Sequence, residues 1–208
     1  MPLKDLSFDV LHPQPLILVI SGTSGIGKDA VLNGLKHCPL PLHFVVTATS
    51  RAPRTGEVEG VDYFFFSREE FENRIQQGYF AEYARVYQDY KGIPRPQIEE
   101  ALKSGKDVIL RVDVQGAATI RSQYPEAILV FLVPNTVEEW YNRLANRGTE
   151  TEESLKVRVD KAISEIAQID LFDYIVLNAE NRLEEAVQDV VDIIRIEHMR
   201  VHPRKILK

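Results

Sequence analysis

The stretch Leu16-Ile17-Leu18-Val19-Ile20-Ser21-Gly22-Thr23-Ser24-Gly25-Ile26-Gly27-Lys28-Asp29-Ala30 decides the fold. It begins with an unbroken apolar run, which predicts a strand buried on both faces. A glycine-rich turn follows, and after it apolar residues recur at the spacing of an amphipathic helix, at Ala30, Val31, Leu32 and Leu35. A buried strand, a tight turn and a helix together predict an α/β fold built on a parallel sheet.

The turn has the pattern of a phosphate-binding loop. Gly22, Gly27 and Lys28 match G-x-x-x-x-G-K. Glycines let backbone N–H groups line a concave anion site, and the following helix adds the positive end of its dipole. A lysine is a flexible charge that can follow a phosphoryl group through its transfer. The alternative is a glycine-rich loop with a surface lysine, but the flanking strand and helix favour a nucleotide site. Asp29 stands where this pattern expects Ser or Thr.

Composition limits the possible classes of protein. The 208 residues, 44% of them hydrophobic, suffice for one α/β domain with insertions or for two small domains. The net charge of −6 argues against a general nucleic-acid binder. One cysteine, Cys38, forms no disulfide framework and suits the cytosol. No apolar run reaches transmembrane length, and residues 1–15 are expected to be a loose tail rather than a signal peptide.

Strand-like and helix-like segments alternate along most of the chain, which predicts a parallel sheet with helices on both faces. Capping boxes at 67–70 and 136–139 predict two helix starts. The region 47–90 breaks the alternation, because it contains a polar loop and strand-like segments at 63–66 and 80–87. It is expected to be an inserted small domain. Further buried strands are expected at 44–46, 107–113, 127–133 and 174–177.

From Leu16 onward the chain resembles guanylate kinases. The blocks that carry this resemblance are TATSRAPRTGE at 47–57, GVDYFF at 60–65, DVQG at 113–116, RGT at 147–149 and VLN at 176–178. Residues 27–30 and YKGIP at 90–94 look like the organelle-targeted guanylate kinases of plants. The sequence has no transit-like extension, so a bacterial relative of that branch is expected.

The resemblance implies the P-loop nucleoside monophosphate kinase fold, in which a parallel sheet has helices on both faces. An inserted small β-rich GMP-binding subdomain and a helical lid complete this fold. The expected boundaries are a core of residues 16–46, 91–135 and 159–208, an insert of residues 47–90 and a lid of residues 136–158.

On the acceptor side, Arg51 and Arg54 lie three residues apart in a polar loop, and Tyr63 follows. Two guanidinium forks and a phenol suit a phosphate. Spacing alone favours solvated arginines and a core tyrosine, whereas the resemblance makes these residues ligands of the GMP phosphate. It also implies GMP contacts for Thr47, Tyr90 and Asp113.

Glu82 interrupts a segment with the apolar alternation of a strand. Burying an acid there costs free energy unless the acid has a partner. A carboxylate can accept both N–H donors on the Watson–Crick edge of guanine, whereas adenine would present an acceptor there. The resemblance matches Glu82 to the glutamate that reads guanine. The alternative is a surface acid on an edge strand.

On the ATP side, the resemblance implies contacts from the loop and two later residues, namely Gly22, Thr23, Ser24, Gly25, Ile26, Gly27, Lys28, Asp29, Ala30, Arg143 and Asn178. Arg147 and Arg158 match lid arginines that close over the transferring phosphoryl group. Spacing alone would make such arginines helix-surface partners of Glu139 or Glu153, and would make Asn178 a turn residue. The expected catalytic residues are Lys28, Arg51, Arg147 and Arg158.

The resemblance implies Mg²⁺ as cofactor. Asp29 and Asp113 are the expected metal-binding residues, since strand-end acids near a phosphate loop commonly hold Mg²⁺ or its waters. The alternative for Asp113 is a helix N-cap, and for Asp29 a helix-capping role. Two further departures from the family pattern are Lys91 and Ile93, where many relatives have Tyr and Ser or Thr, and Arg111, where many have an acid.

The implied reaction is transfer of the γ-phosphoryl group of ATP to GMP or dGMP by a cytoplasmic enzyme. We expect no nucleic-acid or membrane partner, and a monomer or a homodimer. One alternative is a non-catalytic guanylate-kinase-like binding module, but Lys28 and the lid arginines argue against it. The other is a sugar-phosphate kinase of the ribose bisphosphate type, whose members also carry Gly-Lys-Asp. The arginine block and Glu82 favour a guanine nucleotide.

Overall fold

The computed structural model describes residues 13–86, 88–145 and 152–206. Its centre is a five-stranded sheet in the order β2-β7-β1-β8-β9, and every adjacent pair is parallel. These strands are β1 (Ile17–Gly22), β2 (Leu42–Phe44), β7 (Asp107–Arg111), β8 (Ile128–Val133) and β9 (Tyr174–Leu177). The expected α/β class is therefore confirmed.

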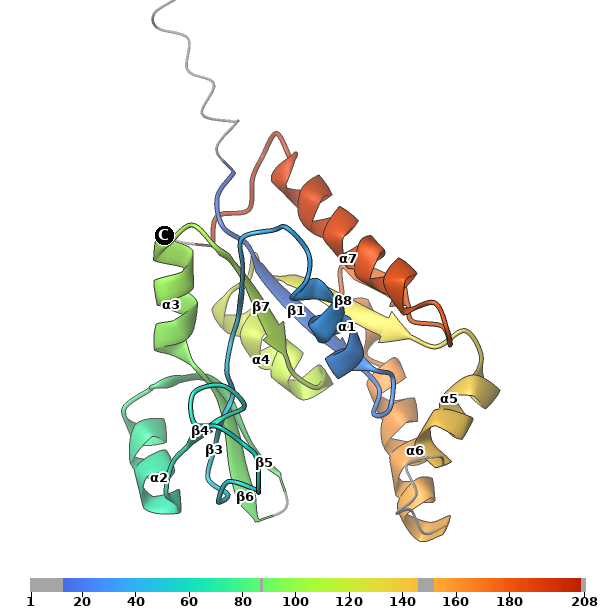
Figure 1. Ribbon diagram of the computed structural model, residues 1–208, viewed down its shortest axis with the longest axis horizontal. Helices are drawn as coiled ribbons and strands as arrows, with labels where there is room; N and C mark the ends of the chain where they lie inside the picture. The colour runs from blue at the N-terminus through green and yellow to red at the C-terminus, as the bar shows by residue number, and fades with distance from the viewer. Residues whose placement is uncertain (1–12, 87, 146–151, 207–208) are drawn as a thin grey trace, which may run out of the picture.

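Helices cover both faces of this sheet (Figure 1). Side chains alternate along β1, so Leu18 and Ile20 pack in one hydrophobic cluster, whereas Ile17 and Val19 pack in another on the opposite face. The first cluster includes residues of α1 (Lys28–Leu35) and α7 (Leu183–His198), and the second includes residues of α3 (Arg95–Lys103) and α4 (Val114–Gln123). The unbroken apolar run thus reflects burial on both faces.

A second sheet, in the order β4-β3-β6-β5, forms the insert at the lower left of Figure 1. The aromatic ring of Phe71 stacks on those of Phe80 and Tyr90, with ring centroids 4.3 and 5.3 Å apart, respectively. Ser67 caps the insert's helix by accepting a hydrogen bond from Glu70 N, as the capping box predicts. The elements of the insert are β3 (Ala48–Thr49), β4 (Phe64–Phe65), α2 (Arg68–Gln76), β5 (Phe80–Val86) and β6 (Asp89–Pro94).

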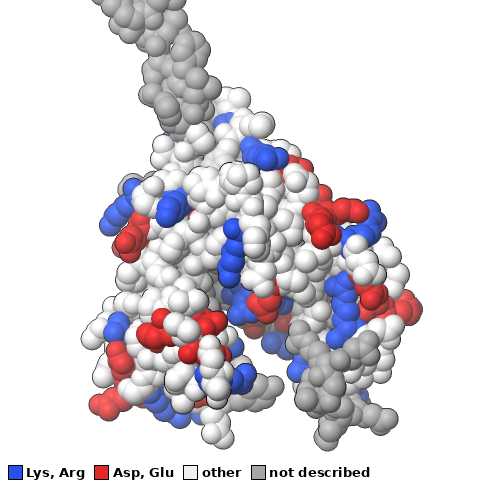
Figure 2. Space-filling model, in the orientation of Figure 1, with Lys and Arg blue, Asp and Glu red and all other residues white. Residues whose placement is uncertain are grey.

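Two helices, α5 (Val137–Ala145) and α6 (Glu152–Ile166), lie at the lower right of Figure 1. Trp140 and Leu144 of α5 pack against Ala162 of α6. A short 3₁₀ helix, η3 (Ile169–Leu171), leads from α6 to β9. Figure 2 shows that the surface is hollowed between this helical part and the insert.

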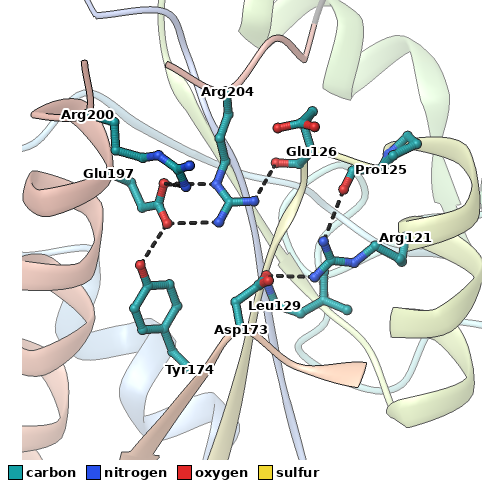
Figure 3. A network of polar contacts seen from close by, with 9 residues as sticks. All are labelled: Arg121, Pro125, Glu126, Leu129, Asp173, Tyr174, Glu197, Arg200 and Arg204. Atoms are coloured by element: carbon teal, nitrogen blue, oxygen red, sulfur yellow. Dashed lines mark hydrogen bonds and ion pairs between the residues drawn. The ribbon is translucent and has the colours of Figure 1, made fainter. Parts of the chain in front are cut away.

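The C-terminal end of α7 is fixed to the sheet by a polar network (Figure 3). The buried Glu197 carboxylate accepts hydrogen bonds from Tyr174, Arg200 and Arg204, at 2.7–3.2 Å. Burial alone would raise the pKa of Glu197, but the donors of Arg204 and Tyr174 outweigh it and lower this pKa to about 2. The network therefore stabilises the fold far from the hollow. No helix in the described ranges is long and apolar enough to cross a membrane.

Several expected bounds do not coincide with the ends of the strands and helices. The strand expected at 44–46 is the half-buried edge strand β2, and β3 lies within a stretch expected to be a loop. The strand expected at 107–113 ends at Arg111, because Asp113 is the N-cap of α4. The boundary at residue 90 falls inside β6, which pairs with β5. The boundary at residue 158 falls inside α6. Short strands and continuous helices have no sequence signal that marks a boundary at these points.

Candidate functional site

The glycine-rich loop follows β1 and runs directly into α1. Gly22 and Gly27 have positive φ angles of 140° and 92°, which residues other than glycine rarely adopt. A Cβ atom at Gly22 would also lie 2.7 Å from Leu132 O, and one at Gly27 would lie 2.7 Å from Asn178 Nδ2. Gly27 is the N-cap of α1 and makes no side-chain cap. The loop and helix start therefore form a main-chain anion site.

Lys28 lies back across this loop. Its Nζ atom donates to Gly22 O at 2.6 Å and to Thr23 O at 3.0 Å. Burial lowers the pKa of Lys28 to about 8, a shift that the negative charge of Glu165 opposes. Asn178, which is buried, donates from Nδ2 to Ile26 O at 2.7 Å. The loop is thus held in shape from both sides.

The helices α5 and α6 contact the same loop. Trp140 Nε1 donates to Ser24 O at 2.9 Å, and Arg158 Nη1 lies 3.3 Å from Ser24 Oγ. Arg143 donates to Ile26 O at 3.3 Å and also pairs with Glu139, the partner expected from helix spacing. Arg147 lies outside the described residues. The structure therefore brings Arg143 and Arg158 to the loop.

A cavity of about 230 Å³ joins the loop to the insert. Glu82 lies in this cavity, and its pKa is raised to about 7, first by burial and then by the charge of Asp113. Gly116 of α4 lies against this carboxylate, since a Cβ atom there would lie 2.8 Å from Val112 Cβ and 3.3 Å from Glu82 Oε1. The residues that line the cavity are Lys28, Thr47, Glu82, Ala84, Val86, Lys91, Gly92, Ile93, Arg111, Val112 and Asp113.

The expected ligands of the GMP phosphate lie elsewhere in the insert. Arg51 forms two hydrogen bonds of 2.6 Å with Glu57, and its guanidinium carbon lies 4.9 Å from the centroid of the Tyr63 ring. Glu57 also accepts from Arg54 N at 2.7 Å. The Tyr90 hydroxyl donates to Glu72 at 3.3 Å. These arginines and tyrosines do not line the cavity that contains Glu82.

The two acids expected at the metal each have a cationic neighbour. Asp29 pairs with Arg111, and Asp113 Oδ2 lies 3.5 Å from Lys161 Nζ while Oδ1 accepts from Gly116 N. In the described part of the chain, no group of three acids, histidines or cysteines could hold a metal by itself. Mg²⁺ usually takes one or two carboxylates and completes its shell with phosphates and water. The side chains of Asp29 and Asp113 are partly exposed to solvent, and two such carboxylates fit that mode of binding.

Two residues of α6 were missed by sequence reasoning. Lys161 Nζ lies 3.5 Å from Asp113 and 3.6 Å from Glu165 Oε1. The Glu165 side chain is only 2% exposed, and its Oε2 atom has no hydrogen-bond partner among the described residues. A charged residue between apolar positions of a helix ordinarily faces solvent, so only the approach of α6 to the loop could reveal these two.

Comparisons with known proteins identify the family of this chain. The sequence profile of the family described as Guanylate kinase matches residues 14–197. The chain belongs to the guanylate kinase family. It is 51% identical, over 93% of its length and 68% of the relative's, to guanylate kinase 2, chloroplastic/mitochondrial, of Oryza sativa subsp. japonica. It is 44% identical to a guanylate kinase of Clostridium tetani, covering 89% of this chain and 88% of that one.

The structure is also similar to a solved guanylate kinase. The crystal structure of guanylate kinase from Anaplasma phagocytophilum matches it with a TM-score of 0.72 and 30% sequence identity. The match covers 91% of this chain and 89% of the other. The expected resemblance to guanylate kinases is therefore confirmed in sequence and fold, and the resemblance to a plant organellar guanylate kinase is confirmed in sequence.

Proposed function

We propose that this protein transfers the γ-phosphoryl group of ATP to GMP or dGMP, giving ADP and GDP. The observation that carries this proposal is the cavity that joins Lys28 of the phosphate-binding loop to the buried Glu82 of the insert. A donor phosphate and an acceptor nucleotide can meet there. Family membership supports the same reaction.

On the ATP side, the loop offers N–H groups from the start of α1 and the charge of Lys28. A phosphate entering the loop replaces the carbonyl contacts of Lys28 with stronger, charge-assisted hydrogen bonds. We propose that Arg143, Arg158 and Arg147 surround the same phosphates. Asn178 holds Ile26 and so supports the loop beside the adenine site.

On the acceptor side, we propose that the Glu82 carboxylate accepts both N–H donors of the guanine edge. Thr47 lies in the same cavity and contributes a hydroxyl. Arg51, Arg54 and Tyr63 bind the GMP phosphate, with Glu57 holding the Arg51 fork in position. Tyr90 and Asp113 complete the GMP site. Because Glu82 and the two arginines occupy different parts of the insert, GMP would span from Glu82 to the arginines.

During transfer, a GMP phosphate oxygen forms a bond to the γ-phosphorus as the bond to the ADP oxygen breaks. The negative charge on the transferring group is stabilised by the cations Lys28, Arg51, Arg147 and Arg158. Mg²⁺, held by Asp29 and Asp113, would neutralise charge on the ATP phosphates. Closure of the insert and of the lid, residues 136–158 in the predicted boundaries, over both nucleotides would exclude water. The single cysteine fits a reducing compartment. We therefore propose a cytoplasmic location, where the reaction would serve purine nucleotide metabolism.

A coupled assay of ADP release tests this function. GMP, dGMP, AMP, IMP and ribose bisphosphate are offered with Mg²⁺ and ATP. We expect rapid turnover of GMP and dGMP and little turnover of the others. Turnover of ribose bisphosphate in preference to GMP would establish the sugar-phosphate alternative, and no turnover with tight GMP binding would establish a binding module.

A further inference from the structure

Two charged residues from distant parts of the sequence contact each other beside the phosphate-binding loop. Asp29 lies in the first turn of α1, and Arg111 is the last residue of β7. These positions are 82 residues apart in sequence, yet the Asp29 carboxylate and the Arg111 guanidinium form an ion pair. The parallel pairing of Ile20 with Arg111 brings the end of β7 beside the loop.

This ion pair lies at the start of α1, beside the loop that we propose binds the nucleotide phosphates. Arg111 lines the cavity together with Lys28 and Asp113. The charges of Arg111 and Asp29 act on Lys28 in opposite directions, since Arg111 lowers the pKa of this lysine and Asp29 raises it. An unpaired carboxylate at residue 29 would repel an incoming polyphosphate.

We propose that Arg111 is a positioning residue that acts through Asp29, neutralising and orienting this carboxylate so that the loop accepts nucleotide phosphates. The inference deepens the proposed function and rests on it for the identity of the nucleotide. The carboxylate of Asp29 is tolerated beside the loop because the Arg111 guanidinium faces it.

Binding of ADP, measured by calorimetry in excess EDTA without GMP, tests this proposal independently of turnover. Arg111→Ala leaves Asp29 unpaired, and we expect about a three- to tenfold weaker Kd, the size of effect that one partly exposed charge produces near a site. Asp29→Ser/Arg111→Ala has neither charge, and we expect its Kd to return to within about twofold of the wild type. Added Mg²⁺ shrinks the Arg111→Ala defect, because the metal offsets the carboxylate.

Arg195→Ala is the matched control, since it removes the same charge from an ion pair with Asp192 near the far end of α7. It should bind ADP as the wild type does. Melting temperatures of all variants check folding, and Arg111→Gln serves as a second neutral variant.

Wild-type ADP affinity in both neutral Arg111 variants would overturn the proposal. A double variant as weak as Arg111→Ala would also overturn it, because Arg111 would then act on the phosphate directly. Either result leaves the GMP kinase assay unaffected.

Discussion

The loop side and the insert side of the cavity hold opposite charges, and burial shifts both toward neutrality. Lys28 projects from a main-chain loop fixed by the central sheet, and its pKa is lowered to about 8. Glu82 belongs to a β-strand of a small sheet, and its pKa is raised to about 7. Each side therefore carries a charge that costs free energy until a substrate pairs with it. The donor side is built from backbone, whereas the acceptor side is built from side chains.

Among the variants that test this comparison, the largest effect is expected on the loop side, from removal of an arginine. Arg158→Ala should lower kcat by about 10³-fold with little change in the KM for GMP, because the charge it meets grows in the transition state. Arg147→Ala should behave in the same way. Steady-state kinetics with varied GMP measure both parameters. A pure KM effect would assign these arginines to ground-state binding.

On the insert side, the expected change is in recognition of GMP. Glu82→Gln replaces an acceptor oxygen by an amide donor that opposes a guanine N–H. Loss of this pairing should lower kcat/KM for GMP by about 30- to 1000-fold, while the Kd for ATP barely changes. The two constants are measured by the coupled assay and by calorimetry. Wild-type GMP kinetics in this variant would remove Glu82 from the base site.

A smaller effect concerns the proposed metal. Asp29→Ala should raise the Mg²⁺ concentration for half-maximal rate by about three- to tenfold, because one anionic oxygen ligand is lost. Asp29→Ser should restore most of the activity. A purely capping role predicts unchanged Mg²⁺ dependence and a loss of about 1 kcal/mol of stability. The N-cap of α1 is Gly27, which already disfavours that role.

The smallest effect is on stability. The pKa of Glu82 is raised on folding, so the folded state binds more protons, and its stability falls as pH rises from about 4.5 to about 7. Glu82→Gln removes this cost. Its melting temperature should exceed that of the wild type by about 2–6 °C at pH 8, and by less at pH 5. Calorimetry at both pH values provides the measurement, and an equal shift at both would show that the charge of Glu82 is not the cause.

The difference between a loop side built from backbone and an insert side built from side chains also explains which features the sequence could predict. The loop was predictable because glycine spacing and an apolar run encode backbone geometry directly. Glu82 could be singled out as a candidate functional residue because an acid interrupts an apolar strand. Its role in guanine recognition came only from the resemblance. The short strand β3, the contact of Arg111 with Asp29 and the burial of Glu165 depend on how distant segments pack. No local pattern records that packing.

Proton release on GMP binding tests the central claim, that the charged Glu82 carboxylate reads guanine, most directly. Calorimetry at pH 6.5 in buffers of different ionisation enthalpy measures this release, and subtracting the value for Glu82→Gln removes the protons that come from the GMP phosphate. A pKa near 7 leaves Glu82 mostly protonated in the free protein at pH 6.5. We predict that the difference in proton release between the wild type and Glu82→Gln exceeds half a proton per GMP, since about three-quarters of such a group is protonated at this pH. Equal release by both proteins would contradict the claim.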